Sequence, residues 1–410
     1  MFNSTTQMTR KNTFHSWKVL VFSLCLVAWT SCKKEESSTV TREPSAVEKT
    51  FKGRINLSQL EQYAGQSVPN YITKDNSGSN PISDKGATLG RVLFYDKKLS
   101  SLNIVSCASC HVQEFAFGDT ARASLGVNGQ TGRHSMRLVN ARFGSETKFF
   151  WDERAISLED QTTKPIQDHN EMGFSGQNGD PDINDLIEKL SKVAYYKELF
   201  RFVYGSEEIT EAKIQHALAQ FIRSIQSFDT KFDAGRSQVT DNLADFPGFN
   251  EEENLGKYLF MTPAIFDANS KRTGGGFGCN NCHRAPEFDI DPDCKSNGIG
   301  VRITGGTDFT NTRAPSLRNL FNAQGLLNGP MMHNAAFNDL HTVLAHYNNL
   351  TEAGLTNTNL DIRLKPNGIS GQQLQMSTLE INALVAFLKT LSGNAVYTDA
   401  KWGNPFPQSN

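Results

Sequence analysis

Cys-Ala-Ser-Cys-His at residues 107–111 and Cys-Asn-Asn-Cys-His at residues 279–283 are two copies of one pattern, Cys-x-x-Cys-His. Two thiols one helical turn apart can each form a thioether bond to a porphyrin, and the adjacent histidine then ligates the iron. Chance placement of 7 cysteines and 9 histidines in 410 residues gives only about 0.003 such matches. The pattern therefore predicts two covalently bound c-type haems. The expected haem cysteines are Cys107, Cys110, Cys279 and Cys282, and the expected iron ligands are His111 and His283.

Zinc is the main alternative for clusters of cysteine and histidine. A structural zinc ion needs four ligands in a tetrahedral arrangement. Only Cys294 and His333 lie at all near the second motif in sequence, and nothing comparable accompanies the first. We therefore interpret both motifs as haem sites. Cys294 is expected to be a free thiol near the second haem, without an assigned role.

The first 32 residues have the pattern of an export signal. Basic residues precede the apolar run 19–29, which at about 11 residues is too short to span a membrane and suits the core of a signal peptide. Cys32 follows that core after a small residue, as at a bacterial lipoprotein cleavage site. We expect residues 1–32 to be a lipoprotein signal peptide, Cys32 the lipid anchor and residues 33–52 a flexible tether. The protein would then be an exported periplasmic or cell-envelope lipoprotein; a plain signal peptide is the alternative.

A weak internal repeat accompanies the two motifs. Leu-Gly-Arg-Val-Leu-Phe at 89–94 precedes the first motif, and Leu-Gly-Lys-Tyr-Leu-Phe at 255–260 precedes the second at nearly the same offset. This predicts two duplicated, cytochrome c-like haem domains, over residues 53–245 and 246–400. The net charge of −2 gives no indication of a nucleic-acid partner.

Apolar residues at helical spacing predict helices over residues 183–204 and 210–228. Ser-Thr-Leu-Glu at 377–380 is a capping-box pattern, and it predicts a helix that runs to Gly393. Alternating strand patterns are scarce, and segments such as 119–145 are rich in Gly and Asn. The expected fold is mainly α, with two cytochrome c-like haem domains and long irregular loops.

Several short blocks outside the haem motifs carry a further pattern. They are Phe-Trp-Asp-Glu-Arg-Ala at 150–155, Leu-Glu-Asp-Gln at 158–161, Glu-Met-Gly at 171–173 and Ala-Pro-Ser-Leu-Arg-Asn at 314–319. In residue type and spacing these blocks resemble the bacterial dihaem cytochrome c peroxidase family, which includes MauG. The resemblance covers roughly residues 80–395. It implies a peroxidatic haem in the first domain and an electron-transfer haem in the second.

The resemblance implies roles for three residues around the first haem. Cleaving the O–O bond of hydrogen peroxide needs a group that moves a proton between the two oxygens, which contributes about 10²–10⁴-fold in rate. Glu171 matches the family's distal glutamate, and Gln161 matches the distal glutamine that orients peroxide or water. Trp151 resembles the tryptophan that relays electrons between the haems. The alternatives are a solvated Glu171, a Gln161 on a helix surface and a Trp151 that merely fills the core.

The chain departs from the family pattern at several positions, among them Asp168-His169, where the family usually has Asn-Pro. Residues 124–129 lack the histidine that ligates the first iron in many members, so we expect a five-coordinate first haem that needs no reductive activation. Glu153 stands where the family usually has glycine. The resemblance also implies calcium between the domains, and His134 stands near the place of its asparagine ligand; a loop or propionate contact is the expected role of His134.

The sixth ligand of the second haem decides between two versions of the chemistry. Tyr347 stands where the family's peroxidases usually have methionine, as it does in MauG. Met331, Met332 and His346 are the other candidates, and a Tyr347 that only packs against the haem edge is a further alternative. Methionine raises the reduction potential of a haem, whereas tyrosinate would lower it and favour storage of an oxidising equivalent.

These features lead to three hypotheses of function. The first is a peroxidase that reduces hydrogen peroxide to water with electrons from a small cytochrome c or cupredoxin, passed through the second haem and Trp151. The second is a MauG-like enzyme that uses high-valent haem iron to oxidise residues of a partner protein. The third is a dihaem electron carrier, against which Glu171 and the open first iron argue. The resemblance also implies a homodimer.

Overall fold

The computed structural model describes residues 43–407. The predicted signal peptide, the Cys32 anchor and most of the tether lie outside the described residues. Within residues 43–407 no helix has the length and apolar character needed to cross a membrane. Residues from Pro44 onward form a single compact unit, so the predicted limits of two domains stay a prediction.

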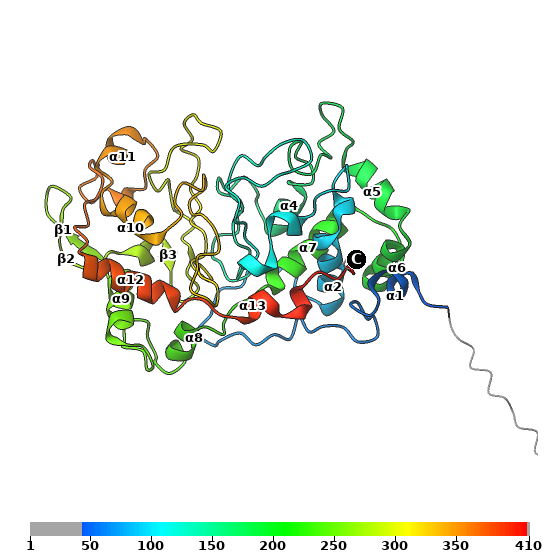
Figure 1. Cartoon of the computed structure of the whole chain (residues 1–410), viewed down its shortest axis with the longest axis horizontal. Coiled ribbons are helices and arrows are strands. Elements are labelled where there is room, and N and C mark those ends of the chain that lie inside the picture. The colour runs from blue at the N-terminus through cyan, green and yellow to red at the C-terminus, as the bar shows by residue number, and fades with distance from the viewer. Residues whose placement is uncertain (1–42, 408–410) are drawn as a thin grey trace, which may run out of the picture. The chain divides into compact units, whose positions relative to one another are not determined.

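The described chain consists mainly of helices joined by long irregular segments (Figure 1). The α-helices are α1 (Ala46–Phe51), α2 (Asp84–Tyr95), α3 (Cys107–Cys110), α4 (Leu158–Thr163), α5 (Ile183–Ser191), α6 (Ala194–Tyr204), α7 (Glu211–Ser224), α8 (Lys231–Arg236), α9 (Glu251–Met261), α10 (Leu340–Asn348), α11 (Thr351–Thr356), α12 (Thr378–Lys389) and α13 (Ala395–Thr398). Two antiparallel strand pairs are present: β1 (Ala264–Phe266) with β2 (Arg272–Gly275), and β3 (His283–Arg284) with β4 (Asp289–Ile290). The expectation of a mainly α protein is confirmed.

The first copy of the repeated hexapeptide lies on α2, which packs against α7. Gly90 allows a very close approach, because a Cβ atom there would lie 2.0 Å from the carbonyl oxygen of Ala217. The next residue, Arg91, is buried and donates hydrogen bonds of 2.7 Å to the carbonyl oxygens of Ala400 and Gly403. The repeat thus supplies a contact glycine followed by a buried cation that binds backbone carbonyls.

The second copy lies on α9 and repeats this arrangement against α12. A Cβ atom at Gly256 would lie 1.9 Å from the carbonyl oxygen of Ala383. Lys257 is fully buried, and its Nζ donates to the carbonyl oxygens of residues 242–244 at 2.7 to 3.2 Å. Buried cations need such partners. The two hexapeptides therefore occupy equivalent positions on two equivalent helix pairs.

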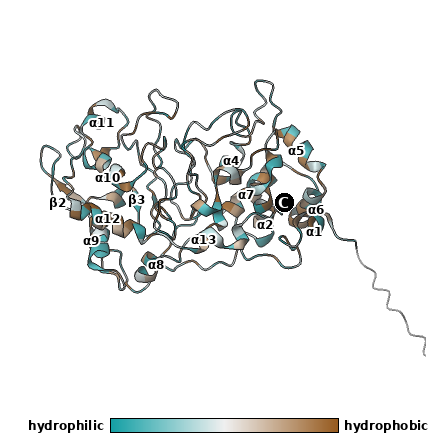
Figure 2. Cartoon of the chain, in the orientation of Figure 1, coloured by the Kyte–Doolittle hydropathy of each residue, from teal (hydrophilic) through white to brown (hydrophobic). Residues whose placement is uncertain are grey.

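Two hydrophobic clusters lie around these helix pairs. The first contains residues of α2, α6 and α7, and the second contains residues of α9 and α12. In the second, the ring centroids of Phe260, Phe288 and Phe387 lie 5.3 to 6.0 Å apart. Such aromatic pairs contribute about 0.5–1.5 kcal/mol each beyond the burial of their area. Figure 2 shows hydrophobic and hydrophilic residues on the same helices, as expected where one helix face meets a core.

One predicted helix is broken into two, and another ends earlier than predicted. The helix predicted over residues 183–204 is two helices, α5 and α6, because Val193 between them has extended backbone angles of φ −91° and ψ 119°. The helix predicted over residues 210–228 ends at Ser224. Hydrophobic spacing continues across both points, so the break is not visible in the periodicity.

The capping box at the start of α12 is confirmed. The Ser377 hydroxyl accepts from the Glu380 N–H at 3.3 Å, and the Glu380 carboxylate accepts from the Ser377 N–H at 2.9 Å. The helix ends at Lys389 rather than at Gly393. Gly393 instead lies against Asp229, whose Oδ1 would be 2.0 Å from a Cβ atom at that position.

Candidate functional site

The first Cys-x-x-Cys-His motif lies on α3, a single helical turn that packs against α2. The His111 Nδ1 lies 3.1 Å from the carbonyl oxygen of Phe117. Because a carbonyl can only accept, this Nδ1 carries the proton, which leaves Nε2 available to ligate a metal. Burial lowers the pKa of His111 and favours the neutral imidazole. Cys107 and Cys110 carry thiols that are partly buried beside it. These residues fit a c-type haem.

Glu171 lies close to this first motif. Burial raises the pKa of the Cys110 thiol to about 11, and the neighbouring Glu171 carboxylate adds to that rise. Burial, and then the charge of Asp168, raise the pKa of Glu171 itself to about 7. A carboxyl group with such a pKa can both accept and donate a proton at neutral pH. Of the residues predicted for the first site, Glu171 has the electrostatic environment that its expected role requires.

The segment without the expected histidine packs directly on the backbone of Glu171. The Val127 N–H donates to the Glu171 carbonyl oxygen at 3.0 Å. A Cβ atom at Gly126 would lie 2.0 Å from the Asn170 carbonyl oxygen, so this position accepts no larger residue without rearrangement. The contact holds the Glu171 backbone in place, and at Gly126 it leaves no room for an imidazole.

Gln161 lies on α4, which packs against α7. The helix is anchored through Glu159, whose carboxylate accepts from Asn80 at 2.8 Å and from Arg223 at 3.1 Å. Ser157 caps its first turn by accepting from the Asp160 N–H at 3.1 Å. The Gln161 side chain is partly buried. A helix fixed in this way and carrying a partly exposed amide is compatible with the orienting role of Gln161.

Trp151 connects segments that accompany the two motifs. Its Nε1 donates to the carbonyl oxygen of His134 at 2.7 Å. Its ring lies edge to face with His333, 6.2 Å between centroids. Its carbonyl oxygen accepts from the N–H groups of Thr312 and Arg313 at 2.9 and 3.1 Å. Trp151 thus borders the second cavity, and its partner His134 belongs to the segment that follows the first motif.

The second motif lines a cavity of about 250 Å³ that extends to Trp151. Its walls are mainly apolar, and Cys279, Cys282, His283 and Tyr347 all border it. Burial lowers the pKa of His283 to about 4, more than the neighbouring carbonyl of Pro315 raises it, so the imidazole is neutral. An apolar cavity with two thiols and a neutral imidazole fits a second c-type haem.

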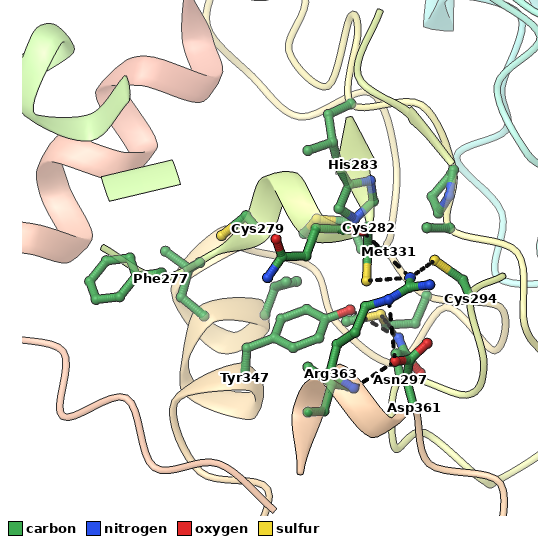
Figure 3. Close-up of a pocket in the computed structure, with 18 of the residues that line it drawn as sticks. Phe277, Cys279, Cys282, His283, Cys294, Asn297, Met331, Tyr347, Asp361 and Arg363 are labelled. Carbon is green, nitrogen blue, oxygen red and sulfur yellow. Dashed lines mark hydrogen bonds and ion pairs between the residues drawn. The ribbon is translucent and has the colours of Figure 1, made fainter. Parts of the chain in front are cut away.

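The candidate sixth ligands lie differently in this cavity. Figure 3 shows the Tyr347 phenol and the His283 imidazole extending toward each other from opposite sides. Met331 and Met332 also border the cavity. The His346 Nε2 lies 2.9 Å from the carbonyl oxygen of Asn297, to which it donates. The geometry therefore favours Tyr347 or a methionine over His346.

The residues around His134 do not suit a calcium ion, which prefers several oxygen ligands. The His134 Nδ1 lies 2.9 Å from the Ala121 carbonyl oxygen. The neighbouring Arg133 forms ion pairs with Asp152 at 2.8 Å and with Asp308 at 2.9 Å. The local carboxylates are thus already neutralised by a guanidinium group, and no step proposed below depends on calcium.

Arg363 and Asp361 lie beside the second motif, and no sequence pattern predicts them there. The Arg363 Nη1 lies 3.0 Å from the Cys294 sulfur and 3.7 Å from the Cys282 sulfur. Cys282, Cys294 and Asp361 are the one group within residues 43–407 whose atoms are close enough to share a metal ion. The positive charge of Arg363 among them opposes a cation, which weakens the zinc alternative. Cys294 lies near the second haem site, as expected.

The chain is similar to several known proteins. Residues 84–240 match the family described as di-haem cytochrome c peroxidase. The chain is 30% identical over 322 residues to the methylamine utilization protein MauG of Methylorubrum extorquens, covering 76% of this chain and 80% of that protein. It is 29% identical over 334 residues to MauG of Methylophilus methylotrophus, covering 78% and 87%. It is 28% identical over 234 residues to the cytochrome c551 peroxidase of Nitrosomonas europaea, covering 57% and 61%.

Solved structures show the same fold. A MauG-like protein associated with microbial copper homeostasis superimposes with a TM-score of 0.63 at 24% identity, covering 83% of this chain and 99% of that one. The diheme peroxidase BthA from Burkholderia thailandensis superimposes with a TM-score of 0.57 at 19% identity, covering 84% and 96%. At these identities the likeness concerns the fold.

Proposed function

The chain belongs to the di-haem cytochrome c peroxidase family, which includes MauG, and we propose on this basis that it reduces hydrogen peroxide to water at its first haem site. It is an oxidoreductase of a family that uses two haem groups. The electrons would come from a small exported cytochrome c or cupredoxin. The observation that carries the proposal is Glu171, a carboxyl group with a pKa of about 7 beside the first Cys-x-x-Cys-His motif.

Both haems would be attached through thioether bonds to the paired cysteines of the motifs, with His111 and His283 as proximal ligands. When bound, the haem supplies an iron that binds peroxide and accepts and passes on electrons. Glu171 would take the proton from the inner oxygen of peroxide and deliver it to the outer oxygen, which then leaves as water. The Gln161 amide would orient peroxide, and Trp151 would carry electrons between the two sites.

Replacement of Glu171 by glutamine tests this role. Glutamine keeps the size of the side chain but cannot take up the proton, so we expect peroxide turnover to fall by about 10²–10⁴-fold while both haems stay attached. The matched control is Glu188→Gln, which alters an exposed carboxylate on α5 that pairs with Lys192. Steady-state turnover and the haem content of each purified variant are measured. Unchanged turnover in Glu171→Gln would show that Glu171 does not transfer the proton during peroxide cleavage.

A second function, MauG-like oxidation of a partner protein, is favoured by one observation. The Tyr347 phenol extends into the second cavity at the position where a low-potential ligand would stabilise stored oxidising equivalents. We expect the wild-type protein, treated with one equivalent of peroxide, to retain those equivalents longer than Tyr347→Met. Titration with a reductant at successive times measures the difference. Equal lifetimes would favour the simple peroxidase.

A further inference from the structure

One partly buried residue, Asn297, contacts three of the side chains that compete for the second haem through its side-chain amide and its backbone carbonyl. The Asn297 Nδ2 donates to the Tyr347 hydroxyl oxygen at 3.2 Å and to the Met332 sulfur at 3.3 Å. The carbonyl oxygen of the same residue accepts from the His346 Nε2 at 2.9 Å. Figure 3 shows Asn297 beside Tyr347 at the edge of the cavity. No sequence pattern marks Asn297, and the proposed function gives it no role.

The orientation of this amide is determined by its other end. The Asn297 Oδ1 accepts from the Ile299 N–H at 3.1 Å. A carbonyl oxygen cannot donate, so the NH₂ group must be the end that faces Tyr347 and Met332. Its two hydrogens allow one hydrogen bond to each. The assignment of donor and acceptor at these two candidate ligands is therefore unambiguous.

The backbone that carries Asn297 is firmly held. The preceding residue, Ser296, is fully buried, and its hydroxyl accepts from the Asn357 amide at 2.8 Å. Its N–H donates to the Asn359 carbonyl oxygen at 3.0 Å, and its carbonyl oxygen accepts from the Asp361 N–H at 2.9 Å. Gly298 follows with a left-handed φ of 95°. An amide on such a rigid support can discriminate between ligands that approach it.

The three contacts affect the candidates unequally. His346 donates its Nε2 proton to a carbonyl, so that nitrogen is unavailable to iron. The Met332 thioether is a weak hydrogen-bond acceptor and gains little from the amide. An ionised phenol oxygen gains most, because a hydrogen bond to a charged acceptor is roughly twice as strong as a neutral one. The amide therefore favours the Tyr347 oxygen over both neighbours.

We propose that Asn297 is a positioning residue that makes Tyr347, rather than Met332, the sixth ligand of the second haem. This inference rests on the proposed function, in which the second motif carries a haem. The Asn297 amide holds the phenol oxygen at the cavity, where that oxygen can ligate the iron in place of the Met332 sulfur. Without the amide, Tyr347 loses this advantage, and the Met332 sulfur can take its place as the sixth ligand.

The test uses the oxidised holoprotein and compares Asn297→Leu, Asn297→Asp and Tyr347→Phe with the wild type. Leucine keeps the volume but donates nothing, and the aspartate carboxylate accepts a hydrogen bond from the phenol O–H instead of donating one to its oxygen. We expect both Asn297 variants to lose the tyrosinate-to-iron absorption, to gain the near-infrared band of methionine ligation, and to show a higher reduction potential of the second haem only. Asn297→Leu combined with Met332→Leu should lose the methionine band as well.

The control is Asn357→Ala, which removes the hydrogen bond to Ser296 and touches none of the candidate ligands. It should keep the wild-type spectrum; a shift equal to that of Asn297→Leu would mean that a loosened loop is the cause and would overturn the inference. Unchanged spectra in the Asn297 variants, with a changed Tyr347→Phe, would overturn the role of Asn297 and leave Tyr347 as ligand. An unchanged spectrum in Tyr347→Phe would overturn both the role of Asn297 and the assignment of Tyr347 as ligand. The proposed proton transfer by Glu171 does not depend on this result.

Discussion

At the scale of single residues, Glu171 makes the activity depend on pH. Its pKa is raised to about 7 by burial and by Asp168, and only the ionised form can accept the first proton from peroxide. We expect kcat/KM for peroxide to rise with pH to a plateau, with a midpoint near 7. The same profile for Glu171→Gln should be flat and low. A wild-type midpoint that persists in the variant would assign the titration to another group.

Glu171 also makes stability depend on pH. Because its folded pKa of about 7 exceeds its ordinary value of 4.5, the folded state binds the proton more tightly than the unfolded state. The resulting stability is complete below about pH 4.5 and is lost as pH rises through 7. Glu171→Gln should therefore melt at a higher temperature than the wild type at pH 8 and at a similar temperature at pH 4. If Glu171→Gln melted at a lower temperature than the wild type at pH 8, the ionised Glu171 carboxylate would not destabilise the folded protein, which would contradict this prediction.

Individual residues divide into those that the sequence could identify and those that it could not. The haem cysteines and histidines follow from local spacing, and Glu171 followed from a resemblance. Asn297 contacts Tyr347 across 50 residues of sequence, and Arg363 contacts Cys282 across 81. Such contacts depend on tertiary packing, and a polar residue in an irregular segment gives no local signal of them.

At the scale of elements, the two contact glycines determine how closely their helices pack. A Cβ atom at Gly256 would meet the backbone of Ala383 at 1.9 Å, so α9 and α12 would have to separate. We expect Gly256→Ala to reduce the free energy of unfolding by about 1–3 kcal/mol, through overpacking. Gly90→Ala should act similarly on α2 and α7. Gly65→Ala, where no atom lies within 4 Å of the added carbon, is the control, and urea unfolding is the measurement.

Elements were predictable where one local interaction decides them. The Ser377 capping box correctly marked the start of α12, and the two copies of the repeated hexapeptide lie on the equivalent helices α2 and α9. The break between α5 and α6 at Val193 was not predictable, because apolar residues continue at helical spacing on both sides of it. The helix α12 ends at Lys389, and Gly393 instead lies against Asp229, which is far away in the sequence.

At the scale of the whole molecule, the proposed role of Trp151 is to carry electrons between the two sites. We expect Trp151→Phe to slow steady-state turnover with a reduced small cytochrome more than it slows the first reaction with peroxide. Phenylalanine keeps much of the apolar volume but loses the hydrogen bond to His134. Stopped-flow and steady-state rates measure the two steps. Equal effects on both would indicate a role at the first site rather than between the sites.

The cell-envelope location is a separate prediction about the whole molecule. If Cys32 carries the lipid, Cys32→Ser should move the exported protein from the membrane fraction to the soluble fraction without a change in haem content. Fractionation with immunodetection measures this. A protein that stays in the membrane fraction after the substitution would contradict anchoring through Cys32.

The central claim is that two similar Cys-x-x-Cys-His motifs support two different irons. His111 would hold an open iron beside Glu171, and His283 would hold a closed one opposite Tyr347. Electron paramagnetic resonance of the fully oxidised holoprotein tests this most directly. We predict one high-spin, five-coordinate haem and one low-spin, six-coordinate haem, with the high-spin signal lost on addition of peroxide. Two low-spin haems that do not respond to peroxide would contradict the account.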